Sequence, residues 1–236
     1  MSRVHLLLAF ALSVAFSLVA FAPLGLAARI GTWPDGLSVR QVEGPLWAGR
    51  LTGVRWQGQA FDTVDAALHP LSWTWGIPRL ALHADGLDIA WSAGRVQGVH
   101  HADGEVELAP SSSWPGLALT AQADGLQALF GDGRCLRAGG ALQLQAGGGP
   151  IPGDPVRLAG PARCEGEEAR IDLMPVQPAP GQPDIRADLR IAADGGYRAT
   201  IRVVSQDPQV IAALALVEFQ PGPGGASRVV EGRLGD

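Results

Sequence analysis

The fold class follows most directly from LALHADGLDIAW, residues 80–91. Apolar residues alternate with small or polar ones on both sides of Asp85 and Gly86, which is the pattern of two half-buried strands joined by a tight turn. Similar short alternating segments, each ending at a glycine-containing turn, fill residues 37–108. The chain is therefore predicted to be mainly β, with a curved antiparallel sheet built from successive hairpins.

The triplet Ala-Asp-Gly recurs along the chain, at residues 84–86, 102–104, 123–125 and 193–195. Each copy can form the turn of one hairpin. The first three copies are 18 and 21 residues apart, which suits two strands and two turns. Two interpretations stay open, namely a stack of similar hairpins and ordinary turn chemistry in a chain rich in alanine and glycine.

Composition supports a folded chain made of strands. The 236 residues are enough for a sizeable core, and 47% of them are hydrophobic while 17% are charged. The 32 glycines and 18 prolines exceed what helices tolerate.

Charge and motif content exclude several function classes. All 18 basic residues are arginine and the net charge is -5, so neither lysine chemistry nor a basic nucleic-acid face is expected. The HExxH, GxSxG and CxxC motifs are absent from the sequence. We therefore expect no enzyme, no catalytic residue, no metal, no cofactor, no small-molecule substrate and no nucleic acid.

The N-terminal part contains an uncharged, mostly apolar run at residues 6–28. About 20 apolar residues suffice to span a bilayer, so one transmembrane anchor is predicted there, with residues 1–5 in the cytoplasm and residues 29–236 in the periplasm. A cleaved signal peptide with a site near Gly25 and Ala27 is the alternative. The apolar run is longer than the usual core of a signal peptide, which favours the anchor.

Cys135 and Cys164 are the two cysteines of the chain, and both lie in the part predicted to be exported. The periplasm is oxidising enough to join them, so a structural disulfide is predicted. A redox or metal-binding pair would need a CxxC motif or companion ligands.

Proline and glycine punctuate the second half of the chain. A Gly/Pro stretch at 146–155 suggests a subdivision of the periplasmic domain, and residues 174–184 contain four prolines. Asp207 and Pro208 form an N-cap and a first helical position before an apolar stretch, which predicts a short helix. From about residue 220 the chain either closes with one more strand at 227–234 or forms a flexible tail.

One motif connects the chain with a known family. The run GPLWAG at residues 44–49 follows GLSV at 36–39 and precedes Trp56 and LHP at 68–70. With this spacing after one apolar segment, the chain resembles the protein N family of the bacterial type II secretion system. The ending also matches, with DGGYR at 194–198 and GRL at 232–234 resembling the family's final hairpin.

The resemblance implies an accessory subunit of the inner membrane. Such a subunit has one membrane helix and a C-terminal periplasmic domain, and it serves the machine that exports folded proteins through an outer-membrane secretin. We expect a non-enzymatic scaffold whose partners are the subunits of the inner-membrane platform and the secretin. The residues expected to specify the fold are Gly44, Leu46, Trp47, Gly49, Trp56 and Pro70.

Two other function classes are alternatives to the scaffold. A membrane-anchored periplasmic protein with a long curved sheet could bind or transfer lipid, which would require a continuous apolar groove on the concave face. A periplasmic hydrolase would require a pocket with convergent polar groups, for which the sequence supplies no candidate.

Overall fold

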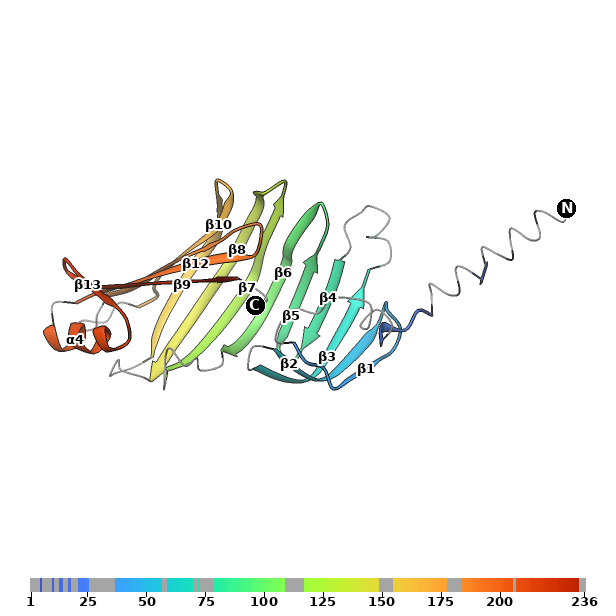
Figure 1. Ribbon diagram of the computed structural model, residues 1–236, viewed down its shortest axis with the longest axis horizontal. Helices are drawn as coiled ribbons and strands as arrows, with labels where there is room; N and C mark the ends of the chain where they lie inside the picture. Colours follow the sequence, from blue (N-terminus) through green and yellow to red (C-terminus); the bar gives the residue numbers. More distant parts are fainter. Residues whose placement is uncertain are drawn as a thin grey trace.

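The computed structural model is dominated by one open antiparallel sheet (Figure 1). It describes residues 5, 10, 13–14, 17, 21–25, 37–56, 59–69, 72, 79–108, 117–148, 155–177, 184–205 and 207–233. The prediction of a mainly β chain with an antiparallel sheet is confirmed.

The sheet has 14 strands, and their order in space follows the order in sequence until the end, where β14 lies between β12 and β13. Every pair of neighbouring strands is antiparallel, as expected for strands joined directly to one another. The strands are β1 (Gln41–Glu43), β2 (Gly49–Trp56), β3 (Gln59–Leu68), β4 (Arg79–Ala84), β5 (Leu87–Ser92), β6 (Val96–Leu108), β7 (Leu117–Gly131), β8 (Arg134–Gly148), β9 (Val156–Glu165), β10 (Glu168–Pro175), β11 (Asp184–Ile191), β12 (Gly196–Val204), β13 (Gln220–Gly222) and β14 (Gly225–Arg233).

The Ala-Asp-Gly triplets do not all form turns. Asp85 and Gly86 join β4 to β5, and residues 193–195 join β11 to β12, as predicted. The triplets at 102–104 and 123–125 instead lie inside the long strands β6 and β7, where the pairing register shifts. The prediction of one hairpin per triplet was therefore wrong for these two copies.

The two internal triplets form bulges because their glycines adopt positive φ angles, 124° at Gly104 and 56° at Gly125. The carboxylate of Asp103 accepts a hydrogen bond from the Gly125 N–H at 2.6 Å, which satisfies a backbone donor at the bulge. Bulges bend a strand and increase its twist. The same three residues that close a hairpin elsewhere thus curve the middle of the sheet.

Two separate clusters of buried apolar side chains stabilise the sheet. The first belongs to β2–β4 and consists of Leu51, Val54, Val64, Ala66 and Ala84. The second belongs to the C-terminal half and consists of Leu158, Ala162, Ile171, Leu173, Ile185, Val203, Leu214, Phe219 and Ala226. Alternation of side chains along β10 explains the second cluster, because residues 169, 171 and 173 are buried while residues 168, 170 and 172 are not.

The C-terminal half of the sheet turns back toward its middle. Leu142 and Leu144 of β8 pack against the cluster that contains Val203 of β12. The side-chain amide of Gln97, at the start of β6, donates a hydrogen bond to the Ala193 carbonyl in the β11–β12 turn at 2.6 Å. The curved sheet therefore has one face that bears the clusters, here called the apolar face, and an opposite face that bears residues 168, 170 and 172, here called the charged face.

The predicted helix is present as α4 (Pro208–Leu216). The side chain of Asp207 caps it by accepting a hydrogen bond from the Gln209 N–H at 2.8 Å, and Pro208 occupies the first turn. Residues 220–233 form β13 and β14. Of the two alternatives for this part of the chain, the structure therefore contains the closing strand and not the flexible tail. The sheet also continues across the Gly/Pro stretch at 146–155, because Ala146 pairs with Val156.

The disulfide between Cys135 and Cys164 is confirmed. It joins the start of β8 to the end of β9, at the end where the pairing between these strands stops at Ala141 and Pro161. Proline has no N–H to continue the hydrogen-bond ladder. The disulfide therefore holds two strands together where backbone hydrogen bonds no longer do.

Most of the predicted anchor, residues 6–28, lies outside the described residues. In the part of the chain that the structure describes, no helix has the length and apolar character needed to cross a membrane. Residues 22–24, which belong to the end of the predicted anchor, lie against the sheet. Pro23 is incompatible with the interior of a regular helix, which accounts for a break at this point.

Candidate functional site

The motif GPLWAG forms the turn between β1 and β2. Gly44 has a φ of 83°, and a Cβ on it would lie 2.8 Å from the carbonyl oxygen of Ala48. Only glycine adopts this conformation without strain and also fits the close backbone approach. The turn then leads directly into Gly49, the first residue of β2.

The turn holds the N-terminal segment 22–24. The Leu24 N–H donates to the Gly44 carbonyl at 3.0 Å, and the Leu46 N–H donates to the Ala22 carbonyl at 2.8 Å. The Leu24 side chain packs against the cluster of β2–β4. A Cβ on Gly49 would lie 2.2 Å from Cδ2 of Leu24, so Gly49 leaves the space that this side chain occupies. We call residues 44–49 together with 22–24 the N-terminal seat.

The predicted fold-specifying residues divide into two groups in the structure. Gly44, Leu46, Trp47 and Gly49 all belong to the N-terminal seat, where Leu46 and Trp47 are half-buried. The Leu46 carbonyl also accepts a hydrogen bond from the Leu68 N–H at 3.4 Å, which ties the turn to the end of β3. Trp56 lies at the opposite end of β2 and is 37% exposed. Pro70 lies outside the described residues.

A double-mutant cycle tests the seat. We expect Gly49→Ala to lower the free energy of unfolding by about 1–3 kcal/mol, because the added methyl group displaces Leu24. The same substitution in a Leu24→Ala background should cost less, since the colliding side chain is gone. Urea unfolding of the purified protein measures both values. Equal costs in the two backgrounds would show that Leu24 does not occupy the space beside Gly49.

A pocket of about 520 Å³ opens beside the seat. Gly44, Ala48, Arg50, Asp65 and His83 contribute to its lining. Arg50 and Asp65 form an ion pair at 2.7 Å, and the hydrogen bond from Arg50 lowers the pKa of the Asp65 carboxyl. Both polar groups thus bind each other across β2 and β3. In the part of the chain that the structure covers, no group of three His, Cys, Asp or Glu residues could hold a metal ion.

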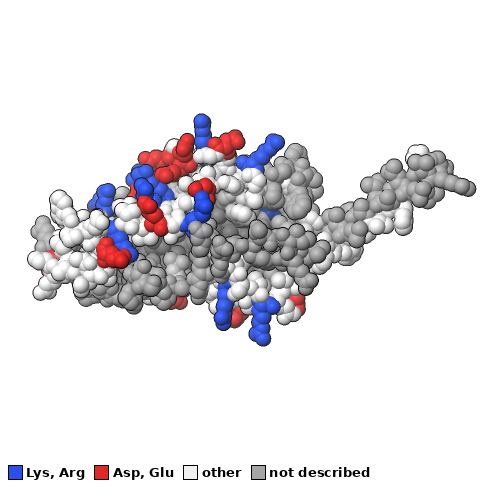
Figure 2. All heavy atoms as spheres, viewed as in Figure 1, with Lys and Arg blue, Asp and Glu red and all other residues white. Residues whose placement is uncertain are grey.

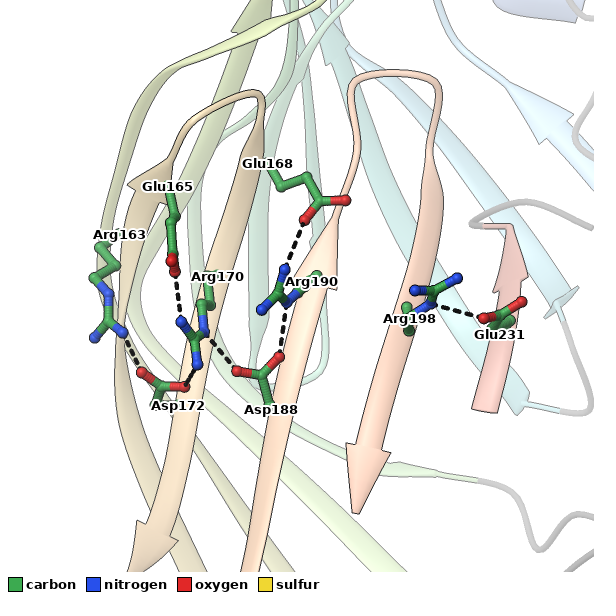
Figure 3. A network of polar contacts seen from close by, with 9 residues as sticks. All are labelled: Arg163, Glu165, Glu168, Arg170, Asp172, Asp188, Arg190, Arg198 and Glu231. Atoms are coloured by element: carbon green, nitrogen blue, oxygen red, sulfur yellow. Dashed lines mark hydrogen bonds and ion pairs between the residues drawn. The ribbon is translucent and has the colours of Figure 1, made fainter. Parts of the chain in front are cut away.

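A network of ion pairs covers the charged face of β9–β12, and Figure 2 shows side chains of both signs gathered there. Arg170 lies at its centre (Figure 3). Its guanidinium contacts Glu165 at 2.6 Å and Asp172 at 3.0 Å, and it also donates to Asp188. Arg163 contacts Asp172 from β9.

The network continues across β11. Arg190 contacts Asp188 at 3.0 Å and Glu168 at 3.6 Å. Burial raises the pKa of Asp188, but hydrogen bonds from Arg190 and Arg170 outweigh it and the pKa is lowered. The hydrogen bond from Arg170 lowers the pKa of Glu165 as well. This network was not predicted from the sequence, although charged residues two apart, as in Arg186, Asp188 and Arg190, are a signal for one face of a strand.

Removing Arg170 should lower stability at neutral pH, because Asp172 and Asp188 lose a shared cation. The ordinary pKa values are 4.5 for Glu and 3.8 for Asp, and the lowered values in the fold mean that the network stabilises fully above about pH 4.5 and less as the pH falls through the folded pKa values. We therefore expect the difference in stability between the wild type and Arg170→Gln to shrink once the pH falls below the ordinary Asp pKa of 3.8. Thermal unfolding across pH measures it.

Arg186→Gln is the control for that experiment. Arg186 is 60% exposed and contacts Asp184 at 2.7 Å, so its loss should change stability less than the loss of Arg170. A difference for Arg170→Gln that persists unchanged in acid would show that the arginine acts through packing and not through charge.

The geometry defines a class of protein: a single-layered curved sheet whose first hairpin binds the N-terminal segment and whose charged face carries paired side chains. The family model for type II secretion system (T2SS), protein N, matches residues 35–229, and the chain belongs to this family. The protein is therefore an accessory component of type II secretion, a system for protein transport. No curated protein and no solved structure matches the chain.

Proposed function

We propose that the protein is a non-enzymatic scaffold of the type II secretion system. The apolar segment within residues 6–28 holds it in the inner membrane, and the sheet lies in the periplasm, where it contacts platform subunits and the secretin. The observation that carries the proposal is the extent of the family match, which begins before β1 and ends within β14. The unit that the family shares is thus the sheet itself.

The form of the sheet supports a role in binding. An open sheet has two edges and two faces, and both kinds of surface can bind protein partners. The charged face presents groups that are already paired, so it resists non-specific association while it remains polar.

Crosslinking in native membranes, followed by affinity purification and mass spectrometry, tests the proposal. We expect the secretin and platform subunits among the recovered proteins. Trp47→Ala is the matched control, because Trp47 belongs to the N-terminal seat and its loss should lower stability without changing the recovered subunits. Recovery of no secretion subunit with the wild-type chain would contradict the scaffold.

A second candidate, the binding or transfer of lipid, is favoured by one observation. Between the two clusters the apolar face bears large side chains that are open to solvent, since Trp91 is 44% exposed and Leu108 is 39% exposed. Extracting lipid from the purified protein tests this candidate. Stoichiometric lipid without secretion subunits would support it against the scaffold.

A further inference from the structure

The last strands of the sheet are unequal in length. β12 pairs with all nine residues of β14, from Gly225 to Arg233. β13 has three residues and pairs with Gly225–Ser227. Beyond this point no strand among the described residues pairs with the outer edge of β14. We call Val229–Arg233 the open edge.

The junction between α4 and β13 ends the pairing of β13 with β14. If β13 extended in register toward its N-terminal side, Glu218 would lie opposite Val229. Glu218 instead adopts a positive φ of 66°, which leads the chain into β13 from the end of α4. The Arg228 guanidinium holds this junction by donating to the Val217 carbonyl at 2.9 Å and to the Glu218 carboxylate at 2.7 Å. A strained, hydrogen-bonded junction therefore prevents β13 from covering the open edge.

The charged side chains of the open edge form ion pairs with side chains of β12 and of the turn before it. Glu231 accepts a hydrogen bond from Arg198 at 2.7 Å (Figure 3), and Arg233 contacts Asp194 at 2.9 Å. Both partners belong to β12 or to the turn before it. Val229 is 55% exposed, and with Val230 it gives the edge two β-branched residues, which favour extended backbone.

We propose that the open edge is a docking site for an extended, non-acidic strand of another secretion-system subunit, which adds to the sheet beside β14. The proposal rests on the proposed scaffold function and names the surface that serves it. Unpaired N–H and C=O groups of an edge strand give affinity for any extended segment, and the flanking side chains select its sequence. Glu231 disfavours an acidic residue directly opposite.

The same residue argues against a second copy of this chain as the partner. An antiparallel self-pairing that used all of Val229–Arg233 would place Glu231 opposite the Glu231 of the other copy. Like charges directly opposite each other destabilise a strand pair. A different protein is therefore the better fit for this edge.

Site-specific photocrosslinking in native membranes tests the proposal. A photoreactive amino acid at Val229 should capture a secretion subunit. The matched control is the same amino acid at Val204, which is 51% exposed, similar to the 55% of Val229, but lies on β12, whose two sides are both paired. Equal capture from the two positions, or capture of a second copy of this chain at Val229, would overturn the proposal.

A pair of proline variants supplies an independent test. Successive residues of a strand direct their N–H groups to opposite neighbours, so one of Val229 and Val230 donates toward β12 and the other toward the open edge. Proline at the residue whose N–H donates toward β12 should unfold the end of β14. Proline at the residue whose N–H points to the open edge should leave the melting temperature nearly unchanged. We expect the variant that keeps its stability to lose most of the crosslinked subunit in purifications from membranes.

The outcomes separate this proposal from the scaffold function. If the wild-type chain recovers secretion subunits and the stable proline variant recovers them equally, the scaffold stands and the open edge is not the docking site. If the wild-type chain recovers none, both proposals fail.

Discussion

Gly104→Ala is expected to lower the free energy of unfolding by about 4 kcal/mol, the combined cost of backbone strain and overpacking. A Cβ on Gly104 would lie 1.9 Å from the carbonyl oxygen of Gly86, and the residue has a φ of 124°. The neighbouring atom belongs to backbone, so no side-chain rotation relieves the contact. Urea unfolding monitored by tryptophan fluorescence measures the change.

Two other glycines provide graded controls. Gly86 has a positive φ of 74° but open space where a Cβ would be, so Gly86→Ala should show the cost of strain alone, about 1–2 kcal/mol. Gly222 has neither a close neighbour nor a positive φ, so Gly222→Ala should be nearly neutral. If Gly104→Ala costs no more than Gly86→Ala, the close approach between the β4–β5 turn and β6 does not exist in solution.

Removal of the disulfide should have an effect of similar size. Cys135 and Cys164 are 29 residues apart, and closing a loop of this length contributes about 3–4 kcal/mol in the chain-entropy model. The double variant Cys135→Ser/Cys164→Ser should therefore unfold at a clearly lower urea concentration. We expect the effect to be large because β8 and β9 lack backbone pairing beyond Pro161.

A reducing agent serves as the control for the disulfide experiment. Reduction should shift the wild-type chain to the unfolding midpoint of the double variant and should leave the variant unchanged. A wild-type midpoint that is insensitive to reduction would contradict a stabilising role for this bond.

Local patterns were enough to predict much of the fold. Alternation around Asp85 and Gly86 predicted a hairpin that the structure contains, and Asp207 with Pro208 predicted α4. The cysteine pair predicted a bond that is present. In each case the deciding residues are close in sequence or have a single available partner.

Features that depend on strand register escaped prediction. A glycine with positive φ serves a turn and a bulge equally well, so the triplet that contains Gly104 gave no sign of lying inside a strand. The network around Arg170 requires the alignment of β9, β10 and β11. The motif residue Gly49 was identified by resemblance. Glycine is needed there because the side chain of Leu24, 25 residues earlier in the sequence, occupies the space beside it.

The N-terminal seat fixes the distance between residues 22–24 and the far edge of the sheet. Two backbone hydrogen bonds and the half-buried Leu24 side chain join residues 22–24 to the first hairpin, which leaves little slack between this segment and β2. Neighbouring strands are about 4.8 Å apart, so the far edge lies up to about 60 Å away measured along the sheet. With the anchor that we propose within residues 6–28, the number of strands would therefore set the distance from the bilayer at which the far edge meets its partners.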